Sequence, residues 1–451
     1  MSVMIAGITD RAMRWFENYN CLPGIVNKTA GFVVKHINSG NNRRVIRKIQ
    51  LRRLRSTVQY VAVHSPFYRE MFKRLGVRPG DIRTVENLQE LPFTTDDDIR
   101  NWRKFLCVPQ DRLAAIFATS GTTGEPKRVY FSYREMQMFT NLYALTARMG
   151  HAGRVVGFIA LPTRHGLWIG SAIAHRAVER AGGLPIPAGA DNTVETIQWM
   201  KRFEPNIIFS SPSYMTALTR KAEQEGYRLE IDKVLTGGEL LTEEHKKYFH
   251  EYWKAQVYDS YGSTEIGGAL TIALPGCCAF HFNDLHLLTE IIDPVTGKPA
   301  EEGELVFTTL RREAMPLLRY RSGDRARWVE CGCGLPFVAA KVLGRTDKMM
   351  VVGDMNLYGR VILEAISKIS GATGRIAIKL LKSGMTDKMV LRVEGDVGAQ
   401  DVRLALLEAY SEMETNIANG NLILEIETGA DLGSQIKAIK ILDDRNIYFQ
   451  Q

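Results

Sequence analysis

A loop rich in serine, threonine and glycine surrounds a single lysine in the run "ATSGTTGEPKRVYFS", which spans residues 118–132. Gly121 and Gly124 allow backbone N–H groups to curl around an anion, and Lys127 adds a positive charge. The hydroxyl donors of the loop are Thr119, Ser120, Thr122 and Thr123. A plain polar hairpin needs fewer such residues, so the run predicts a loop that holds phosphate.

The setting of this loop differs from that of the P-loop ATPases. A Walker loop reads G-x-x-x-x-G-K-[ST] and lies between a strand and a helix. Here Pro126 precedes the lysine, and short apolar runs at 113–118 and 129–131 predict a strand on each side. The sequence therefore predicts phosphate binding by a strand–loop–strand unit of another class.

Four of the six cysteines lie close together in the sequence, and a histidine lies among them. The cluster consists of Cys277, Cys278, His281, Cys331 and Cys333. One cysteine of the first pair, the histidine and the later two cysteines would form a closed Cys₃His zinc site. Because no secretory signal is recognisable, we expect a structural zinc ion rather than a disulfide framework. Buried reduced cysteines are the alternative interpretation.

The positive charge of the chain is concentrated near its N-terminus. Residues 1–56 contain eleven lysines and arginines and two acidic residues, whereas the whole chain has a net charge of +8. Such a basic segment is usually the solvent-exposed face of a helix. Contact with an anionic membrane surface is the alternative interpretation. We expect no nucleic-acid partner. Without a signal sequence or an apolar run of membrane-spanning length, we expect a cytoplasmic protein.

Hydrophobic periodicity divides the chain into segments with different predicted secondary structure. Residues 43–75 predict one or two helices, and "LPFTTDDDIRNW" predicts a short capped helix. From about 134 to 260, apolar runs alternate with helical patterns, which is typical of a parallel α/β sheet. Successive strands are expected over 280–345. We expect three parts, namely a basic N-terminal extension (1–50), a large domain (51–346) and a small α+β domain (347–451).

The chain resembles the adenylate-forming superfamily of acyl-CoA synthetases, adenylation domains and luciferase, because "TSGTTGEPK" is similar to the phosphate loop of that superfamily. Further segments resemble the phenylacetate–CoA ligase-like branch, in the same order, from about residue 50 to the end. They include "PFYREMF", "LPFTTDDDIR", "LTGGELLTEE", "YDSYGSTEIGG", "AMPLLRYRSGD" and "LGRTDKMM". The resemblance implies an α/β fold, with a large N-terminal adenylate-forming domain that contains α/β sheets and a β-rich subdomain, and a small mobile α+β C-terminal domain.

The resemblance also implies a site for ATP and Mg²⁺. Lys127 and the loop 119–124 would hold the β- and γ-phosphates, and Thr264 would contact the α-phosphate. Glu265 would bind Mg²⁺, an ion that takes one or two carboxylates together with phosphate oxygens. The residues expected around the adenine and ribose are Gly237, Gly238, Glu239, Asp259, Tyr261, Gly262, Asp324 and Arg345.

A catalytic lysine and a hinge follow from the same resemblance. Lys437 matches the lysine that reaches the carboxylate and the α-phosphate, with Lys440 as the competing candidate. Asp347 matches the hinge about which the small domain swings between two half-reactions. The residues expected to line the acid pocket are His165, Trp168, Ser211, Tyr214 and Gly237, with Tyr143, Pro212 and Tyr261 beside them. The aromatic members suit a flat aromatic acid, although each alone is equally typical of core.

These assignments imply an ATP-dependent ligase. It would convert a carboxylic acid into an acyl-adenylate with release of pyrophosphate and then transfer the acyl group to CoA. The aromatic residues of the pocket favour an aromatic acid. The branch carries Arg-Gly in a run like "IIRGVNVFPSQ", whereas this chain has Gly353 and Asp354 in "VVGDMNLYGRV". A carboxylate there would crowd CoA. The alternatives are an adenylating enzyme whose acceptor is a carrier-protein thiol, an amine or a hydroxyl, and a binding module without activity. A homodimer stays open.

Overall fold

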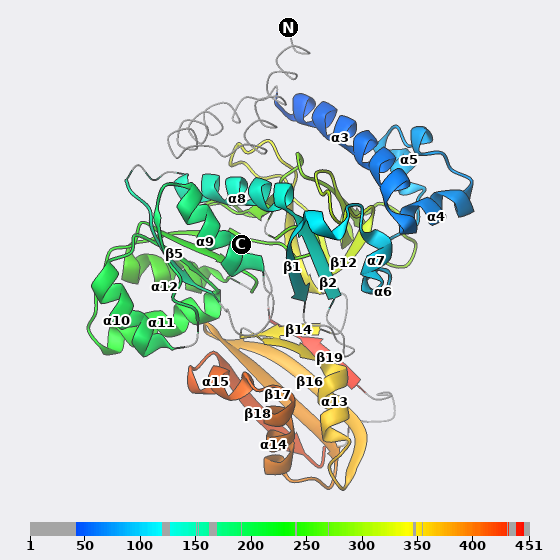
Figure 1. The fold of residues 1–451 in the computed structure, drawn as a ribbon. Helices are drawn as coiled ribbons and strands as arrows, with labels where there is room; N and C mark the ends of the chain where they lie inside the picture. The colour runs from blue at the N-terminus through cyan, green and yellow to red at the C-terminus, as the bar shows by residue number, and fades with distance from the viewer. Residues whose placement is uncertain are drawn as a thin grey trace.

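The computed structural model describes most of the chain from residue 42 onward. The described residues are 42–119, 127–149, 151, 153–161, 169–190, 192–239, 241–268, 270–345, 349–353, 355–430, 432 and 439–445. They form a large upper body of helices and sheets and a smaller α+β body below it, which confirms the expected α/β architecture (Figure 1). None of the helices in this part of the chain is long and apolar enough to cross a membrane.

Helices open the described chain. α3 (Asn42–His64) and α4 (Pro66–Leu75) confirm the helices predicted over residues 43–75. The Ser65 hydroxyl accepts a hydrogen bond from the Tyr68 N–H and caps α4. Short helices follow, with the bounds η1 (Pro79–Asp81), α5 (Val85–Gln89), α6 (Asp96–Arg100), α7 (Trp102–Phe105) and η2 (Gln110–Arg112).

The predicted boundary after residue 50 falls inside α3. Ile46 and Ile49 of this helix pack with Leu285 of the large domain. The Gln50 side chain donates to the Asp284 carboxylate at 3.1 Å. Residues 42–50 therefore belong to the same helix as residues 51–64, and they pack on the large domain.

The phosphate-loop run forms an antiparallel pair of strands, β1 (Leu113–Thr119) and β2 (Lys127–Ser132). This pairing confirms the predicted strand–loop–strand unit. Thr119 lies opposite Lys127 at the end of the ladder, so Lys127 is fixed at the mouth of the loop.

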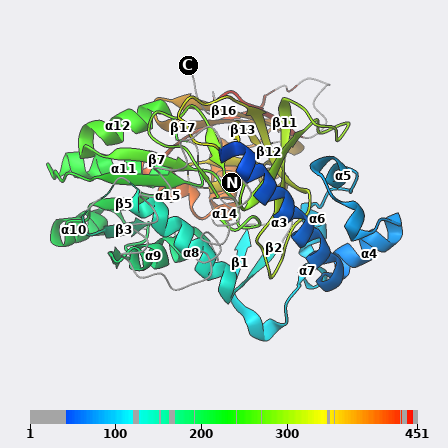
Figure 2. The ribbon, with the colours of Figure 1, turned by 90° about the horizontal axis from the view of Figure 1, so that it is seen from above.

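A parallel sheet in the order β4-β3-β5-β6-β7 confirms the alternation predicted from about residue 134 to 260. Apolar side chains of α8 and α9 pack on one face of the sheet, and those of α10, α11 and α12 pack on the other (Figure 2). The carboxyl ends of parallel strands share one edge, so the loops after β6 and β7 emerge together. The helices are α8 (Tyr133–Arg148), α9 (Ile169–Arg180), α10 (Thr193–Phe203), α11 (Pro212–Gln224) and α12 (Glu243–Trp253). The strands are β3 (Val156–Ala160), β4 (Leu184–Ile186), β5 (Ile207–Ser210), β6 (Lys233–Gly237) and β7 (Gln256–Ser260).

The expected β-rich part is a six-stranded antiparallel sheet in the order β10-β11-β12-β13-β9-β8. Its strands are β8 (Thr271–Ile272), β9 (Phe280–Phe282), β10 (Leu287–Ile292), β11 (Glu302–Thr309), β12 (Tyr320–Trp328) and β13 (Ala339–Arg345). Phe280, Phe282 and Phe307 of this sheet share a core with Phe117 and Phe131 of β1 and β2. That core fixes the phosphate-loop strands against the β-rich sheet.

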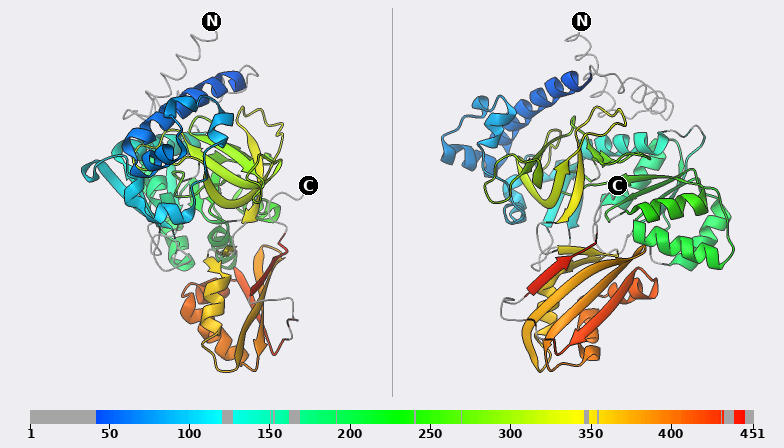
Figure 3. Two further views of the ribbon diagram at one scale, coloured as in Figure 1. Left: turned by 90° about the vertical axis from the view of Figure 1, so that its right-hand side faces the viewer. Right: turned by 180° about the vertical axis from the view of Figure 1, so that it is seen from behind.

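The C-terminal part has a core of its own, to which Ile378, Leu391 and Leu406 contribute. A hairpin of β14 (Met349–Val352) and β15 (Met355–Tyr358) leads into a sheet in the order β18-β17-β16-β19 (Figure 3). The strands of this sheet are β16 (Ala372–Ser383), β17 (Thr386–Gly395), β18 (Leu422–Thr428) and β19 (Ile439–Asp443). The helices are α13 (Gly359–Ile366), α14 (Ala399–Ala409) and α15 (Met413–Ala418). The predicted boundary at residue 347 lies outside the described residues and stays a prediction.

Candidate active site

Lys127 lies between two carboxylates in the large domain. Its ammonium is 2.6 Å from Glu265 Oε1 and 2.8 Å from Asp96 Oδ1. Glu265 follows β7, whereas Asp96 opens α6, so the chain brings three distant segments to one point. The Tyr320 hydroxyl donates to the same Asp96 oxygen at 2.6 Å. The lysine predicted to bind phosphate and the carboxylate predicted to bind magnesium are thus direct neighbours.

The charges of this pair stabilise each other. Burial raises the pKa of the Glu265 carboxyl group, but the charge and hydrogen bond of Lys127 outweigh burial and lower that pKa to about 2. Burial lowers the pKa of Lys127, but the carboxylates of Glu265 and Asp96 outweigh it and raise that pKa above its usual range. Both groups are therefore charged at neutral pH.

Arg312 holds the backbone around Glu265 in place. Its guanidinium donates from Nε to Glu135 Oε1 at 2.6 Å, from Nη1 to the Glu265 carbonyl at 2.8 Å and from Nη2 to the Tyr130 carbonyl at 2.7 Å. The guanidinium also lies over the Phe131 ring, 4.1 Å from its centroid. Arg312 and Glu135 are buried, so their charges must remain paired.

The ends of β6 and β7 carry the residues predicted to flank adenine. The buried Asp259 carboxylate accepts from the Thr236 hydroxyl at 3.1 Å and from the Ser260 N–H at 2.9 Å. A Cβ on Gly237 would lie 2.5 Å from the Ser260 Oγ atom, so the two loops approach closely only because residue 237 is glycine. Gly238 has a φ of 84° and turns the chain away from β6.

Tyr261 and Asp324 are joined across two elements. The Tyr261 hydroxyl donates to Asp324 Oδ2 at 2.5 Å, and Asp324 lies opposite Arg345 in the β12–β13 ladder. Gly262 follows Tyr261 directly, and Thr264 is buried at the start of the turn 264–267, immediately before Glu265. Tyr261, Asp324 and the backbone of Arg345 therefore lie on neighbouring segments, and their contact with adenine and ribose stays a prediction.

The carboxylate of Glu239 faces the start of α11. Its oxygens accept from the Ser213 N–H at 2.9 Å and from the Ser213 hydroxyl at 2.8 Å. A carboxylate is favourable there because the first N–H groups of a helix carry partial positive charge. A place for Glu239 beside adenine stays a prediction, and in this structure its oxygens are used by α11.

Two residues predicted for the acid pocket belong to the scaffold of α11. The Ser211 hydroxyl accepts from the Tyr214 N–H and caps the helix. The Tyr214 ring is buried, and its hydroxyl shares a 2.8 Å hydrogen bond with Thr196 of α10. The core thus accounts for both side chains, and their contact with an acid stays a prediction.

The cysteine cluster converges on one point. One ligand atom from each of four residues lies within 4.8 Å of the others, and the four are Cys277, His281, Cys331 and Cys333. Cys333 Sγ is 3.1 Å from His281 Nε2, whereas the Cys278 sulfur is outside this group. His281 lies on β9, and both later cysteines lie between β12 and β13. Of the two candidate cysteines left open by the sequence, the geometry favours Cys277.

Several predicted residues lie outside the described residues: Ser120, Gly121, Thr122, Thr123, Gly124, His165, Trp168, Asp347 and Lys437. Asp354 is also outside them, and for Thr119 and Arg345 only the backbone is described. The roles assigned to these residues stay predictions. Lys440, the competing candidate for Lys437, is exposed on β19 opposite Ala377.

Sequence reasoning missed the residues that support Lys127 and Glu265. The run "LPFTTDDDIR" predicts a capped helix and carries part of the resemblance, but neither assigns a role to a carboxylate in it. Thr95 does cap α6. Its next residue, Asp96, binds Lys127, which lies 31 positions away in the sequence. Arg312 pairs with Glu135 over 177 positions. No local pattern marks such pairs, because the partners meet only after the sheets assemble.

The buried Asp259 carboxyl should make folding stability depend on pH. Burial raises its pKa to about 7, although Lys246 and the hydrogen bonds from Thr236 and Ser260 oppose this shift. The unfolded chain ionises Asp259 near pH 4, so stability should fall as pH rises from about 4 to 7 by up to about 4 kcal/mol.

The variant Asp259→Asn should lack this fall. Denaturant titrations at several pH values from 4 to 8 would measure the free energy of unfolding of both proteins, and the difference between them is compared across that range. Parallel curves over that range would contradict the burial-driven shift.

Comparisons with known proteins agree with this geometry. The model of the AMP-binding enzyme family matches residues 69–309. A phenylacetate–coenzyme A ligase of Pseudomonas putida is 30% identical over 422 residues, which is 89% of this chain and 94% of that protein. A phenylacetate–coenzyme A ligase of Thermus thermophilus is 31% identical over 366 residues, which is 78% of this chain and 82% of that protein.

Solved structures share the fold. A crystal structure of 2-hydroxyisobutyryl-CoA ligase in complex with 2-HIB-AMP and CoA, in the thioesterification state, has a TM-score of 0.75 at 23% identity and covers 90% of this chain and 91% of its own. An open conformation of that ligase has a TM-score of 0.62 at 23% identity and covers 88% of this chain and 91% of its own. With the phosphate-loop strands, the Lys127–Glu265 pair and the identity to the two ligases, the chain belongs to the AMP-binding, adenylate-forming enzymes and, within them, to the phenylacetate–CoA ligase-like branch.

Proposed function

We propose that this chain joins a carboxylic acid to coenzyme A in two steps. In the first step a carboxylate oxygen bonds to the α-phosphorus of ATP and pyrophosphate leaves. In the second step the thiol sulfur of CoA bonds to the acyl carbon, the bond to AMP breaks and the thiol proton passes to solvent. The observation that carries this proposal is the buried Lys127–Glu265 pair at the mouth of the phosphate-loop strands, in a chain whose relatives are acid–CoA ligases.

The charges around Lys127 suit the first step. A carboxylate and a triphosphate repel each other, so the site must supply cations and oriented N–H groups. Glu265 and Asp96 both lie against the same ammonium, which means that two carboxylates face one cation position. This donor set fits Mg²⁺, which would neutralise phosphate charge there when ATP binds. Lys127 would then turn from the carboxylates to the phosphates.

The nucleoside would lie between the carboxyl ends of β6 and β7 and the strand β12. Asp324 offers a carboxylate to the ribose hydroxyls, and Tyr261 orients it through their 2.5 Å hydrogen bond. Burial raises the pKa of Asp259 to about 7, so this carboxyl is only partly ionised near neutral pH and adds less negative charge beside the phosphates than an exposed aspartate would.

An aromatic acid is the substrate class that we propose. Three relatives at 30% identity or more are, by name, phenylacetate–coenzyme A ligases, and a further relative at 26% identity is a 4-chlorobenzoate–CoA ligase. Tyr143 and Tyr261 are half-buried and pack against the core that contains Phe139. A Cβ on Gly268 would lie 2.8 Å from the Tyr143 hydroxyl, so this glycine leaves room for the ring. Such rings stack well on a flat acid.

Coenzyme A is the acceptor that we propose, with a carrier-protein thiol, an amine or a hydroxyl as the alternatives. The support for CoA is that three relatives at 30% identity or more are, by name, coenzyme A ligases. Gly353 is explained by its own turn, because its φ is 60° and a Cβ would lie 2.4 Å from Asn416 Oδ1 of the same domain. Asp354 beside it is the departure that keeps the alternatives open.

The reaction should be detected in two assays on the full chain. Phenylacetate with ATP and Mg²⁺ should drive exchange of labelled pyrophosphate into ATP, and added CoA should yield the thioester. Absence of exchange with a panel of aromatic and aliphatic acids would contradict adenylation. Exchange without thioester, followed by product with an amine or a carrier protein, would move the acceptor to the alternative class.

Replacement of the predicted catalytic lysine should separate binding from chemistry. Lys437→Ala should reduce exchange by at least about a hundredfold, because the ammonium that stabilises the transition state is lost, while ATP binding persists. The matched control is Lys440→Ala, which removes a lysine three positions later. If both variants bind ATP equally but only Lys440→Ala loses pyrophosphate exchange, Lys440 rather than Lys437 is the catalytic lysine.

We also propose a structural zinc ion at Cys277, His281, Cys331 and Cys333. The convergence of these four ligand atoms within 4.8 Å supports a closed tetrahedral site, which would tie β9 to the segment between β12 and β13. Elemental analysis of the purified chain should find about one zinc ion per molecule. Cys333→Ser should lose it and unfold at a lower temperature, whereas Cys278→Ser should retain it. Equal zinc content in both variants would refute this ligand set.

A further inference from the structure

The two domains meet where α11 of the large domain faces the small domain. Arg220 of α11 donates across this interface, from Nη1 to the Gly420 carbonyl at 2.9 Å and from Nη2 to the Thr386 hydroxyl at 3.2 Å. The Thr386 hydroxyl itself donates to the Gly420 carbonyl at 2.9 Å. One planar guanidinium therefore binds two acceptors that are already fixed to each other, which is a geometry that arginine suits and lysine does not.

The acceptor side is shaped to admit this guanidinium. Gly420 has a φ of 69°, and a Cβ on it would lie 3.0 Å from Arg220 Nη1. A side chain at this position would press on the arginine. The turn after α15 thus presents its carbonyl in a conformation that favours glycine.

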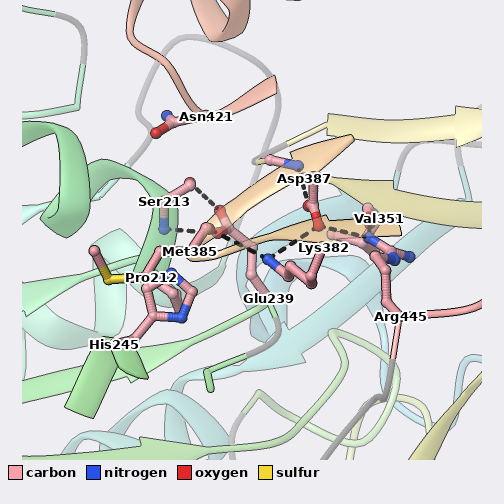
Figure 4. A pocket seen from close by; sticks show the side chains of 11 residues that line it. Pro212, Ser213, Glu239, His245, Val351, Lys382, Met385, Asp387, Asn421 and Arg445 are labelled. Atoms are coloured by element: carbon pink, nitrogen blue, oxygen red, sulfur yellow. Dashed lines mark hydrogen bonds and ion pairs between the residues drawn. The ribbon is translucent and has the colours of Figure 1, made fainter. Parts of the chain in front are cut away.

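A small cavity of about 20 Å³ lies near this contact, since its lining includes Met385 and Asn421, the sequence neighbours of Thr386 and Gly420 (Figure 4). Its wall comes from both domains, with Glu239 and His245 on one side and Gly353, Lys382 and Asp387 on the other. The charged groups have partners inside their own domains. Asp387 is 3.0 Å from Lys382, and Glu239 accepts hydrogen bonds from Ser213. The interface can therefore open without leaving a buried charge unpaired.

The docked end of the small domain is the end that carries Gly353. Gly353 and Met385, next to Thr386, line the same cavity, so the β14–β15 hairpin and the β16–β17 turn face the large domain together. β19 begins at the opposite end of the sheet, because Ile439 pairs with Ile376, about 23 Å along β16 from its last residue. Lys437 precedes Ile439 by two residues in the sequence. The arrangement seen here thus places the Gly353 end of the small domain against the large domain. The start of β19, which follows Lys437 in the sequence, lies at the other end of the sheet.

We propose that Arg220 is a positioning residue for acyl transfer. It holds the small domain with the Gly353 hairpin against the loop of Glu239, and adenylate formation does not require it. This inference rests on the proposed function, since it assigns the observed docking to the second of its two steps.

Arg220→Ala should separate the two steps. Exchange of labelled pyrophosphate should stay within about twofold of the unmodified chain, because the Lys127–Glu265 site is untouched. Single-turnover transfer from preformed phenylacetyl-adenylate to CoA should slow by roughly tenfold to a hundredfold, since two charge-assisted hydrogen bonds of the docked state are lost. Gly420→Ala, on the small-domain side of the interface, should likewise slow acyl transfer and leave pyrophosphate exchange nearly unchanged.

The matched control is Lys221→Ala. This lysine is the next residue of α11, and its ammonium lies 3.6 Å from Glu225 within the large domain. Both rates should be unchanged in that variant, and Arg220→Lys should recover part of the transfer rate. An equal loss of exchange and transfer in Arg220→Ala, or no loss of either, would overturn the positioning role. Absence of exchange in the unmodified chain would instead contradict the proposed function.

Discussion

The buried guanidinium of Arg312 is the constraint on which the candidate site depends. It joins Glu135 of α8, the Tyr130 carbonyl of β2 and the Glu265 carbonyl after β7. A buried arginine that lost one of these partners would leave charge or backbone polarity uncompensated, which is far more costly than an exposed defect. Arg312 therefore couples the positions of the three segments.

The position of Lys127 follows from this assembly. β2 carries both Tyr130, which is bound to Arg312, and Lys127, which is bound to Glu265. Because both ends of the contact are fixed by the same guanidinium, the ammonium and the carboxylate are held at 2.6 Å before any ligand arrives. The segments that carry the two charges are thus fixed in advance, and under the proposed function only the Lys127 side chain would have to turn when ATP and Mg²⁺ bind.

Charged groups at the interface between the domains are paired differently from those inside the large domain. Inside the large domain the buried charges are paired across distant segments and lock them, whereas Asp387 and Glu239 at the interface are paired within their own domains. Separation of the domains costs hydrogen bonds such as those of Arg220 but does not strand a charge. The large domain thus holds the proposed nucleotide site by charges paired between distant segments, whereas the contact between the domains rests on hydrogen bonds of neutral acceptors to Arg220.

Local patterns in the sequence predicted most of the helices and strands and the residues that could bind ATP. Apolar periodicity located the helices of residues 43–75, the parallel sheet and the strand–loop–strand unit around Lys127, because period and turn chemistry are local properties. The tertiary structure decided the partners. It selected Cys277 over Cys278, placed Asp96 against Lys127, and directed the Glu239 carboxylate and the Tyr214 ring into contacts with α11 and the core. These choices depend on distances between residues that are far apart in the chain, and such distances exist only once the sheets and helices have packed.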